Sequence, residues 1–366
     1  SYFIKDASPK IFVCDPQKRK DLEDIADQVG SQVLTLDKDG QGSLQSQANI
    51  LSKTFNTIDR GADDLVALLY TSGTTGRSKG AMLTQNNLLS NAKTLKNLWE
   101  VNEDDILIHA LPIFHTHGLF VALNTALLAG AEVTFLQKFE ITEIIEAIRA
   151  STLLMGVPTF YTRLLADERL TAHLTKNMRL FISGSAPLLA ETHEEFTRRT
   201  GHYILERYGM TETNMITSNP YNGERRPGTV GKPLPDVEIQ INDSQTGRKN
   251  ADGEIGMIEV RGPNVFKGYW NMPDKTALEL KENGFFITGD LGKLSSDGYL
   301  SIVGREKDLI ISGGYNVYPK EIEDVLNEIE KIDETAVFGI SDSDFGELVV
   351  AAVVMAKNES FDKSET

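Results

Sequence analysis

The chain has 366 residues, of which 40% are hydrophobic and 25% are charged, and its formal net charge at pH 7 is -16. These values are typical of a globular protein with room for two domains. The acidic balance and the lack of a basic patch argue against a nucleic-acid partner. The single cysteine, Cys14, excludes an internal disulfide and a cysteine-based zinc site.

The chain contains no apolar run of transmembrane length and no signal peptide, which favours a cytoplasmic protein without a membrane partner. The sequence starts at Ser1 without an initiator methionine, and the strand-like run at 349–356 is followed by a polar tail. We therefore expect the sequence to be part of a longer protein.

Apolar runs alternate with amphipathic stretches through the first 206 residues, which predicts a layered α/β fold with mainly parallel strands. The helices are expected at 17–29, 117–129, 141–150, 160–166 and 189–200. The strands are expected at 11–14, 33–36, 106–114, 132–136, 153–157, 180–183 and 202–206. Residues 38–61 are polar and are expected to form a loop with one short helix.

The pattern changes near Pro235. Short apolar runs separated by Gly, Asp and Asn turns predict a small antiparallel or barrel-like unit, with strands at 237–241, 256–261, 285–288 and 299–303. The last part reads as strand, glycine-rich turn, helix and two strands, at 309–311, 312–314, 319–330, 335–340 and 348–355. We therefore expect three parts, at 1–234, 235–304 and 305–366.

The most informative run is Tyr70–Gly80, where glycines, hydroxyl side chains and Lys79 directly follow an apolar strand. Glycine lets backbone N–H groups approach an anion, and the hydroxyls and the lysine add donors and charge. This composition predicts a polyphosphate-binding loop. The run is not a Walker A loop, because it does not contain Gly-x-x-x-x-Gly-Lys-Ser/Thr. The alternative is a hairpin loop rich in turn-forming residues.

Four further runs carry residues suited to nucleotide chemistry. Small residues at 184–186 would let a flat ring lie against the backbone, and Tyr208 offers an aromatic face. Glu212 is a hard oxygen ligand for Mg²⁺. Asp290 could accept hydrogen bonds from ribose hydroxyls, and Arg305 could reach ribose or phosphate. Each run alone is equally consistent with a turn, a cap or a solvated charge.

Two histidines, His115 and His117, are flanked by apolar residues. A His-x-His pair can bind a metal, but no third ligand is near in the sequence, so we expect His115 to line a pocket. The alternative is a core histidine with its hydrogen bonds satisfied. In the loop 223–231, Arg225 or Arg226 could clamp a carboxylate, although solvation is the default for such arginines.

Taken together and in this order, these runs resemble the adenylate-forming (acyl-CoA synthetase) superfamily. The signatures are found at 71–80, 112–115, 183–187, 208–212, 288–290, 304–308 and 312–323. The runs 108–120, 155–165 and 211–221 are most similar to the malonyl-CoA synthetase branch, which makes malonyl-CoA, and often methylmalonyl-CoA, from the free diacid, ATP and coenzyme A.

The resemblance implies a layered α/β/α large domain with a small β-barrel-like subdomain, followed by part of a small α+β C-terminal domain. It also implies an acid–thiol ligase that uses ATP, Mg²⁺ and coenzyme A. The implied nucleotide-binding residues are Thr71, Ser72, Gly73, Thr74, Thr75, Gly76, Lys79, Gly184, Ser185, Ala186, Pro187, Glu206, Arg207, Tyr208, Gly209, Met210, Thr211, Asp290 and Arg305.

The resemblance assigns further roles by position. The residues expected to take part in catalysis are Thr71, Lys79, Thr211, Glu212 and His115. Glu212 would bind the metal, Lys307 would be the hinge of the C-terminal domain, and Ser312, Gly313 and Gly314 would approach coenzyme A. A buried diacid needs a partner for its second charge, and we expect Arg225, with His115 beside the acyl group, to provide it.

Two departures from the family count against a complete enzyme. The family begins roughly a hundred or more residues upstream, and it carries a lysine in a Pro-Arg-x-x-x-Gly-Lys context near its end. Nothing after Val353 matches that context, because Lys357 and Lys363 lie in the polar tail. We therefore expect impaired adenylation. The alternatives are a synthetase for another short-chain, fatty or aryl acid, and a nucleotide-binding fragment without turnover.

Overall fold

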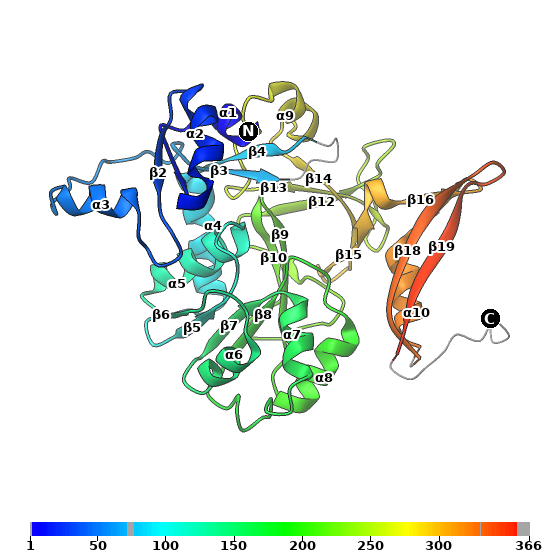
Figure 1. Ribbon diagram of the computed structural model, residues 1–366. Coiled ribbons are helices and arrows are strands. Elements are labelled where there is room, and N and C mark those ends of the chain that lie inside the picture. Colours follow the sequence, from blue (N-terminus) through cyan, green and yellow to red (C-terminus); the bar gives the residue numbers. More distant parts are fainter. Residues whose placement is uncertain (1, 72–76, 330, 357–366) are drawn as a thin grey trace. The chain divides into compact units, whose positions relative to one another are not determined.

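The computed structural model describes residues 2–71, 77–329 and 331–356, and the chain divides into two compact units, residues 1–64 and 65–366 (Figure 1). The first unit contains a two-stranded parallel sheet in which Ile11 pairs with Gln32. Cys14, Ala26 and Val33 form its small core. Its elements are α1 (Tyr2–Ala7), β1 (Ile11–Cys14), α2 (Arg19–Asp27), β2 (Gln32–Thr35) and α3 (Ser43–Ile50).

The second unit is built on a seven-stranded sheet with the order β11-β10-β9-β8-β7-β5-β6. Strands β6, β5, β7, β8 and β9 are parallel neighbours, whereas β10 and β11 are antiparallel additions. The strands are β5 (Ile106–His109), β6 (Glu132–Phe135), β7 (Leu153–Gly156), β8 (Leu180–Ser183), β9 (Leu205–Met210), β10 (Asn214–Ser218) and β11 (Lys232–Pro233). This arrangement confirms the predicted α/β class.

Helices bury their apolar faces against this sheet. Leu95, Ile144, Tyr161 and Phe196 come from four different helices and belong to one hydrophobic core with the strands. The helices are α4 (Gln85–Leu98), α5 (Leu123–Ala129), α6 (Ile141–Ile148), α7 (Pro158–Leu165) and α8 (Ala190–Thr200), and a π-helical segment (His117–Ala122) precedes α5. Helix α4 begins at a capping box, in which Thr84 and Asn87 bond each other's backbone N–H groups.

Two of the predicted strand boundaries that differ from the structure bear on the site. The strand expected at 106–114 ends at His109, ahead of Pro112, which has no N–H for a ladder. The strand expected at 202–206 begins at Leu205 and continues to Met210. The residues from Arg207 to Met210 therefore lie on strand β9 rather than in the loop that was expected after residue 206.

The remaining strands before residue 306 are antiparallel, and those after Pro235 agree with the change of pattern there. A hairpin pairs β3 (Leu65–Thr71) with β4 (Lys79–Thr84). A four-stranded sheet follows the order β12-β13-β14-β15. Its strands are β12 (Glu238–Asn242), β13 (Gly256–Arg261), β14 (Phe286–Leu294) and β15 (Leu300–Arg305), and α9 (Pro273–Glu279) lies between β13 and β14. Leu83, Ile258 and Phe286 belong to a second core shared by the hairpin and this sheet.

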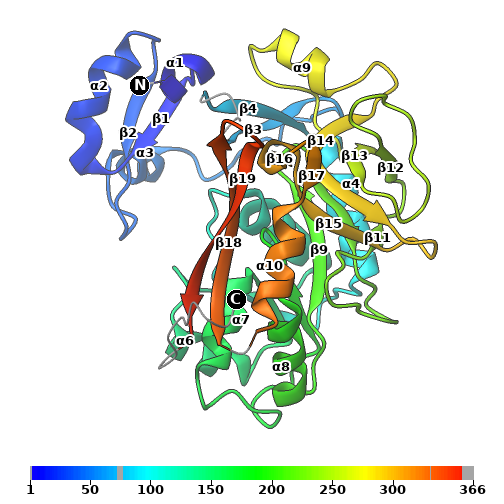
Figure 2. The ribbon, with the colours of Figure 1, turned by 90° about the vertical axis from the view of Figure 1, so that its right-hand side faces the viewer.

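The last part of the chain forms a four-stranded sheet with the order β17-β16-β19-β18. Its elements are β16 (Ile310–Ser312), β17 (Tyr315–Val317), α10 (Pro319–Asn327), β18 (Ile332–Asp342) and β19 (Gly346–Met355). Figure 2 shows α10 lying along β18. Among the described residues, no helix combines the length and the apolar character that a membrane crossing requires.

Candidate functional site

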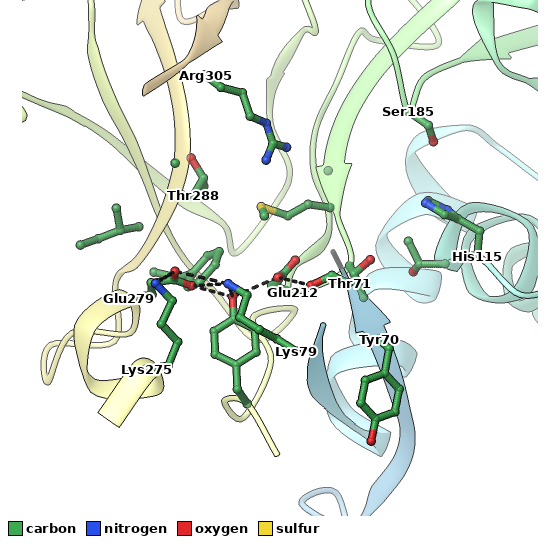
Figure 3. Close-up of a pocket in the computed structure, with 18 of the residues that line it drawn as sticks. Tyr70, Thr71, Lys79, His115, Ser185, Glu212, Lys275, Glu279, Thr288 and Arg305 are labelled. Atoms are coloured by element: carbon green, nitrogen blue, oxygen red, sulfur yellow. Dashed lines mark hydrogen bonds and ion pairs between the residues drawn. The ribbon is translucent and has the colours of Figure 1, made fainter. Parts of the chain in front are cut away.

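A cavity of about 720 Å³ opens in the second unit, between the β3–β4 hairpin, the ends of β9 and β14, helix α9 and the segment 115–117 (Figure 3). Residues predicted for the site from separate motifs meet here. Those that line the cavity are Thr71, Lys79, His115, Ser185, Arg207, Gly209, Met210, Thr211, Glu212, Arg305 and Lys307. Residues 72–76 of the predicted phosphate loop lie outside the described residues.

One wall of the cavity carries the carboxylates of Glu212 and Glu279 (Figure 3), and Tyr269 lies between them. The Tyr269 hydroxyl lies 3.0 Å from Glu212 Oε1 and 2.6 Å from Glu279 Oε2. Lys79 Nζ donates to the Tyr269 hydroxyl at 3.0 Å and pairs with Glu279 at 3.2 Å. Thr71 Oγ1 donates to Glu212 at 3.4 Å. Lys275 completes the network with an ion pair to Glu279 at 2.7 Å.

Burial governs the charges in this network. Glu212 is 4% exposed, and burial raises the pKa of its carboxyl. Burial also opposes ionisation of Glu279, but hydrogen bonds from Lys275 and Tyr269 and the charge of Lys79 outweigh it, so the pKa of Glu279 lies below its ordinary value. Glu279 is therefore a carboxylate near neutral pH, held by two lysines.

A second group of bonded side chains, Tyr208, Asp290 and Arg305, joins strand β9 to β14. The Tyr208 hydroxyl donates to Asp290 Oδ2 at 2.5 Å, and Arg305 Nε lies 2.8 Å from the other carboxylate oxygen. Burial raises the pKa of Asp290, against the charge of Arg305. Tyr208 and Asp290 do not line the cavity themselves, but both are neighbours in sequence of residues that do. Three of the residues predicted to hold the nucleoside thus form one hydrogen-bonded unit.

Arg207 is the most unusual residue of the cavity. It is 2% exposed, and its Nε and Nη2 have no hydrogen-bond partner among the described residues. Burial lowers its pKa to about 9, so the side chain is still a cation at neutral pH. An isolated buried charge costs several kcal/mol, on the order of the penalties measured for broken buried pairs. With two guanidinium nitrogens left open by the described part of the chain, Arg207 offers a place for an anion.

The surroundings of Arg207 are shaped to hold the guanidinium. A Cβ on Gly184 would lie 2.4 Å from Arg207 Cζ, so only glycine allows this approach. Ser185 Oγ lies 3.2 Å from His117 Nδ1. Burial, followed by the charge of Arg207, lowers the pKa of both His115 and His117. The two histidines are therefore neutral at pH 7 and leave Arg207 as the cation of this end of the cavity.

The structure does not bring every predicted residue into the site, and Arg225 is the main correction. Its guanidinium donates to the backbone carbonyls of Tyr203, Pro220 and Tyr221 at 2.7 to 3.2 Å, and it does not line the cavity. The donors that a substrate carboxylate would need are used to hold the loop. Arg207, which the sequence analysis had grouped with the nucleotide site, lines the cavity, as does Arg305.

Other predicted residues do not line the cavity. Gly184 and Glu206 flank lining residues in sequence, and Ser312, Gly313 and Gly314 belong to the β16–β17 hairpin and its turn. Ala186 and Pro187 follow β8. The sequence analysis missed Tyr269, Lys275 and Glu279 altogether. These residues come from α9 and the segment before it, where no motif singles them out.

A magnesium site is only partly built by the protein. Within the described ranges, no group of three or more His, Cys, Asp or Glu side chains could hold a metal ion. Glu212, with the Thr71 hydroxyl beside it, offers one carboxylate at the cavity wall. This fits Mg²⁺ bound mainly through substrate phosphates, since that ion commonly takes one or two protein carboxylates in nucleotide sites.

The fold and this cavity define an α/β protein with a cavity lined by charged and hydroxyl side chains, and comparison with protein families identifies it further. Residues 1–270 match the AMP-binding enzyme family, and residues 321–366 match the AMP-binding enzyme C-terminal domain. The chain belongs to the AMP-binding enzyme family.

Among individual relatives, the malonate–CoA ligase of Arabidopsis thaliana is 39% identical over 336 residues, which cover 85% of this chain and 55% of the relative. A long-chain-fatty-acid–CoA ligase of Bacillus subtilis is also 39% identical, over 82% of this chain and 55% of its own length. The ATP-bound crystal structure of MatB from Rhodopseudomonas palustris has 59% sequence identity and a TM-score of 0.97, and the match covers 100% of this chain and 72% of that one. The chain thus spans about half the length of the first two relatives.

Proposed function

We propose that this chain carries the substrate sites of an ATP-dependent acid–thiol ligase that activates malonate and passes the malonyl group to coenzyme A. The observation that carries the proposal is Arg207, a buried cation at one end of the cavity whose Nε and Nη2 have no hydrogen-bond partner among the described residues. A monoacid would leave this charge uncompensated. A dicarboxylate can place one carboxylate on the guanidinium and present the other to ATP.

The chemistry requires a nucleotide, because a carboxylate cannot lose an oxide ion directly. The free carboxylate attacks the α-phosphate of ATP, which gives an acyl-adenylate and releases pyrophosphate. The thiol of coenzyme A then attacks the acyl carbon, and AMP leaves. The chain contributes mainly position and charge neutralisation to both steps. When bound, Mg²⁺ would neutralise phosphate charge beside Glu212 and Thr71.

The residues of the cavity can be assigned to these substrates. Lys79 and the loop that precedes it suit the terminal phosphates, and Tyr208, Asp290 and Arg305 suit the nucleoside. Arg207 suits the second carboxylate of the acid. Lys307, at the start of the last part of the chain, suits a hinge, and Ser312–Gly314 suit an approach of coenzyme A. We also propose that the chain has three parts, at residues 1–234, 235–304 and 305–366.

The main alternative is a longer acid, because a relative named as a long-chain-fatty-acid–CoA ligase is as similar in sequence as the malonate–CoA ligase. Arg207 argues against it. An aliphatic tail beside this buried cation would exclude water from it without offering an acceptor to Nε and Nη2. Malonate and methylmalonate differ by one methyl group, and both are compatible with the charge that Arg207 requires.

A panel of acids tests the proposal. Pyrophosphate release is measured with malonate, methylmalonate, propionate and octanoate, for the wild-type chain and for Arg207→Met. Propionate is the matched control, since a methyl group stands in place of the second carboxylate. Because the chain spans about half the length of curated relatives, binding of each acid in the presence of a non-hydrolysable ATP analogue is measured by calorimetry beside turnover. We expect malonate to bind and propionate to bind at least about tenfold more weakly. Equal binding of the two acids would contradict the proposal.

A further inference from the structure

Helix α9 places a carboxylate where the phosphate loop's lysine would otherwise meet a phosphate. Lys79 ends the loop, and its residue is only 8% exposed. Its ammonium group contacts both carboxylate oxygens of Glu279, at 3.3 and 3.2 Å, and lies 4.2 Å from the centre of the Tyr269 ring. The lysine proposed to hold phosphate is thus already engaged (Figure 3).

Glu279 is held from several sides. Lys275 pairs with its Oε1 at 2.7 Å, and the Tyr269 hydroxyl lies 2.6 Å from its Oε2. Lys79, Lys275 and Glu279 all line the cavity, and Glu279 is half-buried. Two lysines around one carboxylate form an arrangement that an anion with more charge and more oxygens can take over.

We propose that Glu279 is an internal counter-ion that keeps Lys79 and Lys275 in place in the free protein, and that the terminal phosphates of ATP displace it. The inference rests on the proposed function, since it assumes that ATP binds in this cavity. It adds α9 to the site and assigns Lys275 to the β- and γ-phosphates and to pyrophosphate. No residue of α9 was expected there from the sequence.

The physical reason for a counter-ion is the burial of Lys79. An ammonium group so far from water would lose solvation without a partner. Glu279 supplies that partner while the nucleotide is absent. When a nucleotide binds, Glu279 competes with its phosphates for Lys79. Glu279 also lies near Glu212, since the Tyr269 hydroxyl is within hydrogen-bond distance of both carboxylates.

The competition predicts a difference between nucleotides. ATP and pyrophosphate carry the phosphates that meet the two lysines, whereas AMP does not. Glu279→Gln keeps the shape of the side chain and its acceptor for Tyr269 but removes the charge. Affinity for ATP and for pyrophosphate should rise about tenfold in this variant, and affinity for AMP should stay within about twofold. Lys275→Ala should lower the affinity for ATP and for pyrophosphate and leave the affinity for AMP unchanged.

Calorimetric titration of the full chain with ATP, AMP and pyrophosphate, each with Mg²⁺, tests the inference. Glu282→Gln is the matched control, because it removes one negative charge from the exposed segment that follows α9 and lies outside the cavity. AMP binding reports that each variant is folded. A wild-type chain that binds no nucleotide would contradict the proposed function. A wild-type chain that binds ATP and AMP, with a Glu279→Gln variant that binds ATP equally or more weakly, would overturn the counter-ion inference alone.

Discussion

Tyr208 and Asp290, which are 82 positions apart in the sequence, are joined by a hydrogen bond of 2.5 Å from the tyrosine hydroxyl to the carboxylate. Arg305 holds the other oxygen of Asp290 at 2.8 Å. The bond fixes the end of β9 against β14 beside the cavity. It leaves Asp290 with unused lone pairs, because each carboxylate oxygen can accept more than one hydrogen bond.

The first prediction concerns Asp290. In the Asp290→Ala variant, the affinities for ATP and AMP should fall together by about tenfold or more, since a carboxylate that accepts ribose hydroxyls makes charge-assisted hydrogen bonds to both nucleotides. Calorimetric dissociation constants for ATP and AMP measure this effect. Tyr208→Phe is the control, because it removes the hydrogen bond to Asp290 and keeps the ring; we expect a loss of less than about threefold. A loss confined to ATP would assign Asp290 to the phosphates instead.

The second prediction concerns the contact between Gly184 and Arg207. The added methyl group of Gly184→Ala would overlap the guanidinium, and the displacement should weaken malonate binding about tenfold, within the usual cost of overpacking. Affinity for ATP should change much less. Titration of malonate in the presence of an ATP analogue measures the effect.

Gly61→Ala is the matched control for this substitution. Its nearest neighbour, Asp64 Oδ2, lies 4.0 Å from the added carbon, and its backbone conformation is open to alanine. We expect no change in malonate binding there. If Gly184→Ala binds malonate as tightly as the wild type, the role of Arg207 is not the one proposed.

The third prediction separates Arg225 from the substrate. Because its guanidinium donates to three backbone carbonyls, Arg225→Ala should lower the free energy of unfolding by about 2–3 kcal/mol. Malonate affinity should stay within about twofold. Chemical denaturation and calorimetry give the two quantities.

Arg226→Ala is a suitable comparison, since Arg226 makes ion pairs with Glu224 and Asp297 at the surface. Surface pairs contribute about 0–1 kcal/mol, so this variant should lose little stability. A large rise in the malonate dissociation constant of Arg225→Ala, with stability unchanged, would restore the assignment first suggested by the sequence.

The fourth prediction is that His117 makes the free energy of unfolding depend on pH. Burial and the charge of Arg207 lower the pKa of His117 well below 6.5. Below pH 6.5 the unfolded chain therefore binds a proton that the folded chain does not, and this residue makes stability fall as the pH falls. The slope is about 1.4 kcal/mol per pH unit between the unfolded and folded pKa values.

The wild-type profile alone does not isolate this effect. The pKa values of Glu206, Glu212 and Asp290 are raised by burial, and these carboxyls act in the opposite direction as they take up protons. The quantity to measure is the difference between the wild type and His117→Asn in the free energy of unfolding, at several values from pH 7 to pH 5. We expect the difference to shift in favour of the variant as the pH falls. A difference that does not change with pH would contradict the buried neutral state of His117.

Much of the fold could be predicted because buried parallel strands read as continuous apolar runs. Leu153–Gly156 and Leu180–Ser183 are such runs, and all their residues are buried. The extent of β9 was not predictable in this way. It contains Glu206 and Arg207, two charged residues whose burial depends on partners and on a cavity that only the folded chain creates.

The site could be predicted where a local motif carries the chemistry and not where it depends on distant contacts. Glu212 and Asp290 belong to motifs and lie in or beside the cavity as expected. The pairing of Lys79 with Glu279 spans 200 positions, and nothing local in α9 marks it. Arg225 and Arg207 are the same residue type, and spacing alone cannot tell which guanidinium is used by backbone carbonyls and which is left without a partner.

The most direct measurement is a crystal structure of the chain with a non-hydrolysable ATP analogue and malonate. We predict the nucleotide in the cavity, with its terminal phosphates at Lys79 and one malonate carboxylate within hydrogen-bond distance of the Arg207 guanidinium. The other carboxylate should face the α-phosphate. Malonate bound away from Arg207, or a nucleotide bound outside the cavity, would contradict the activation of a dicarboxylate at this site.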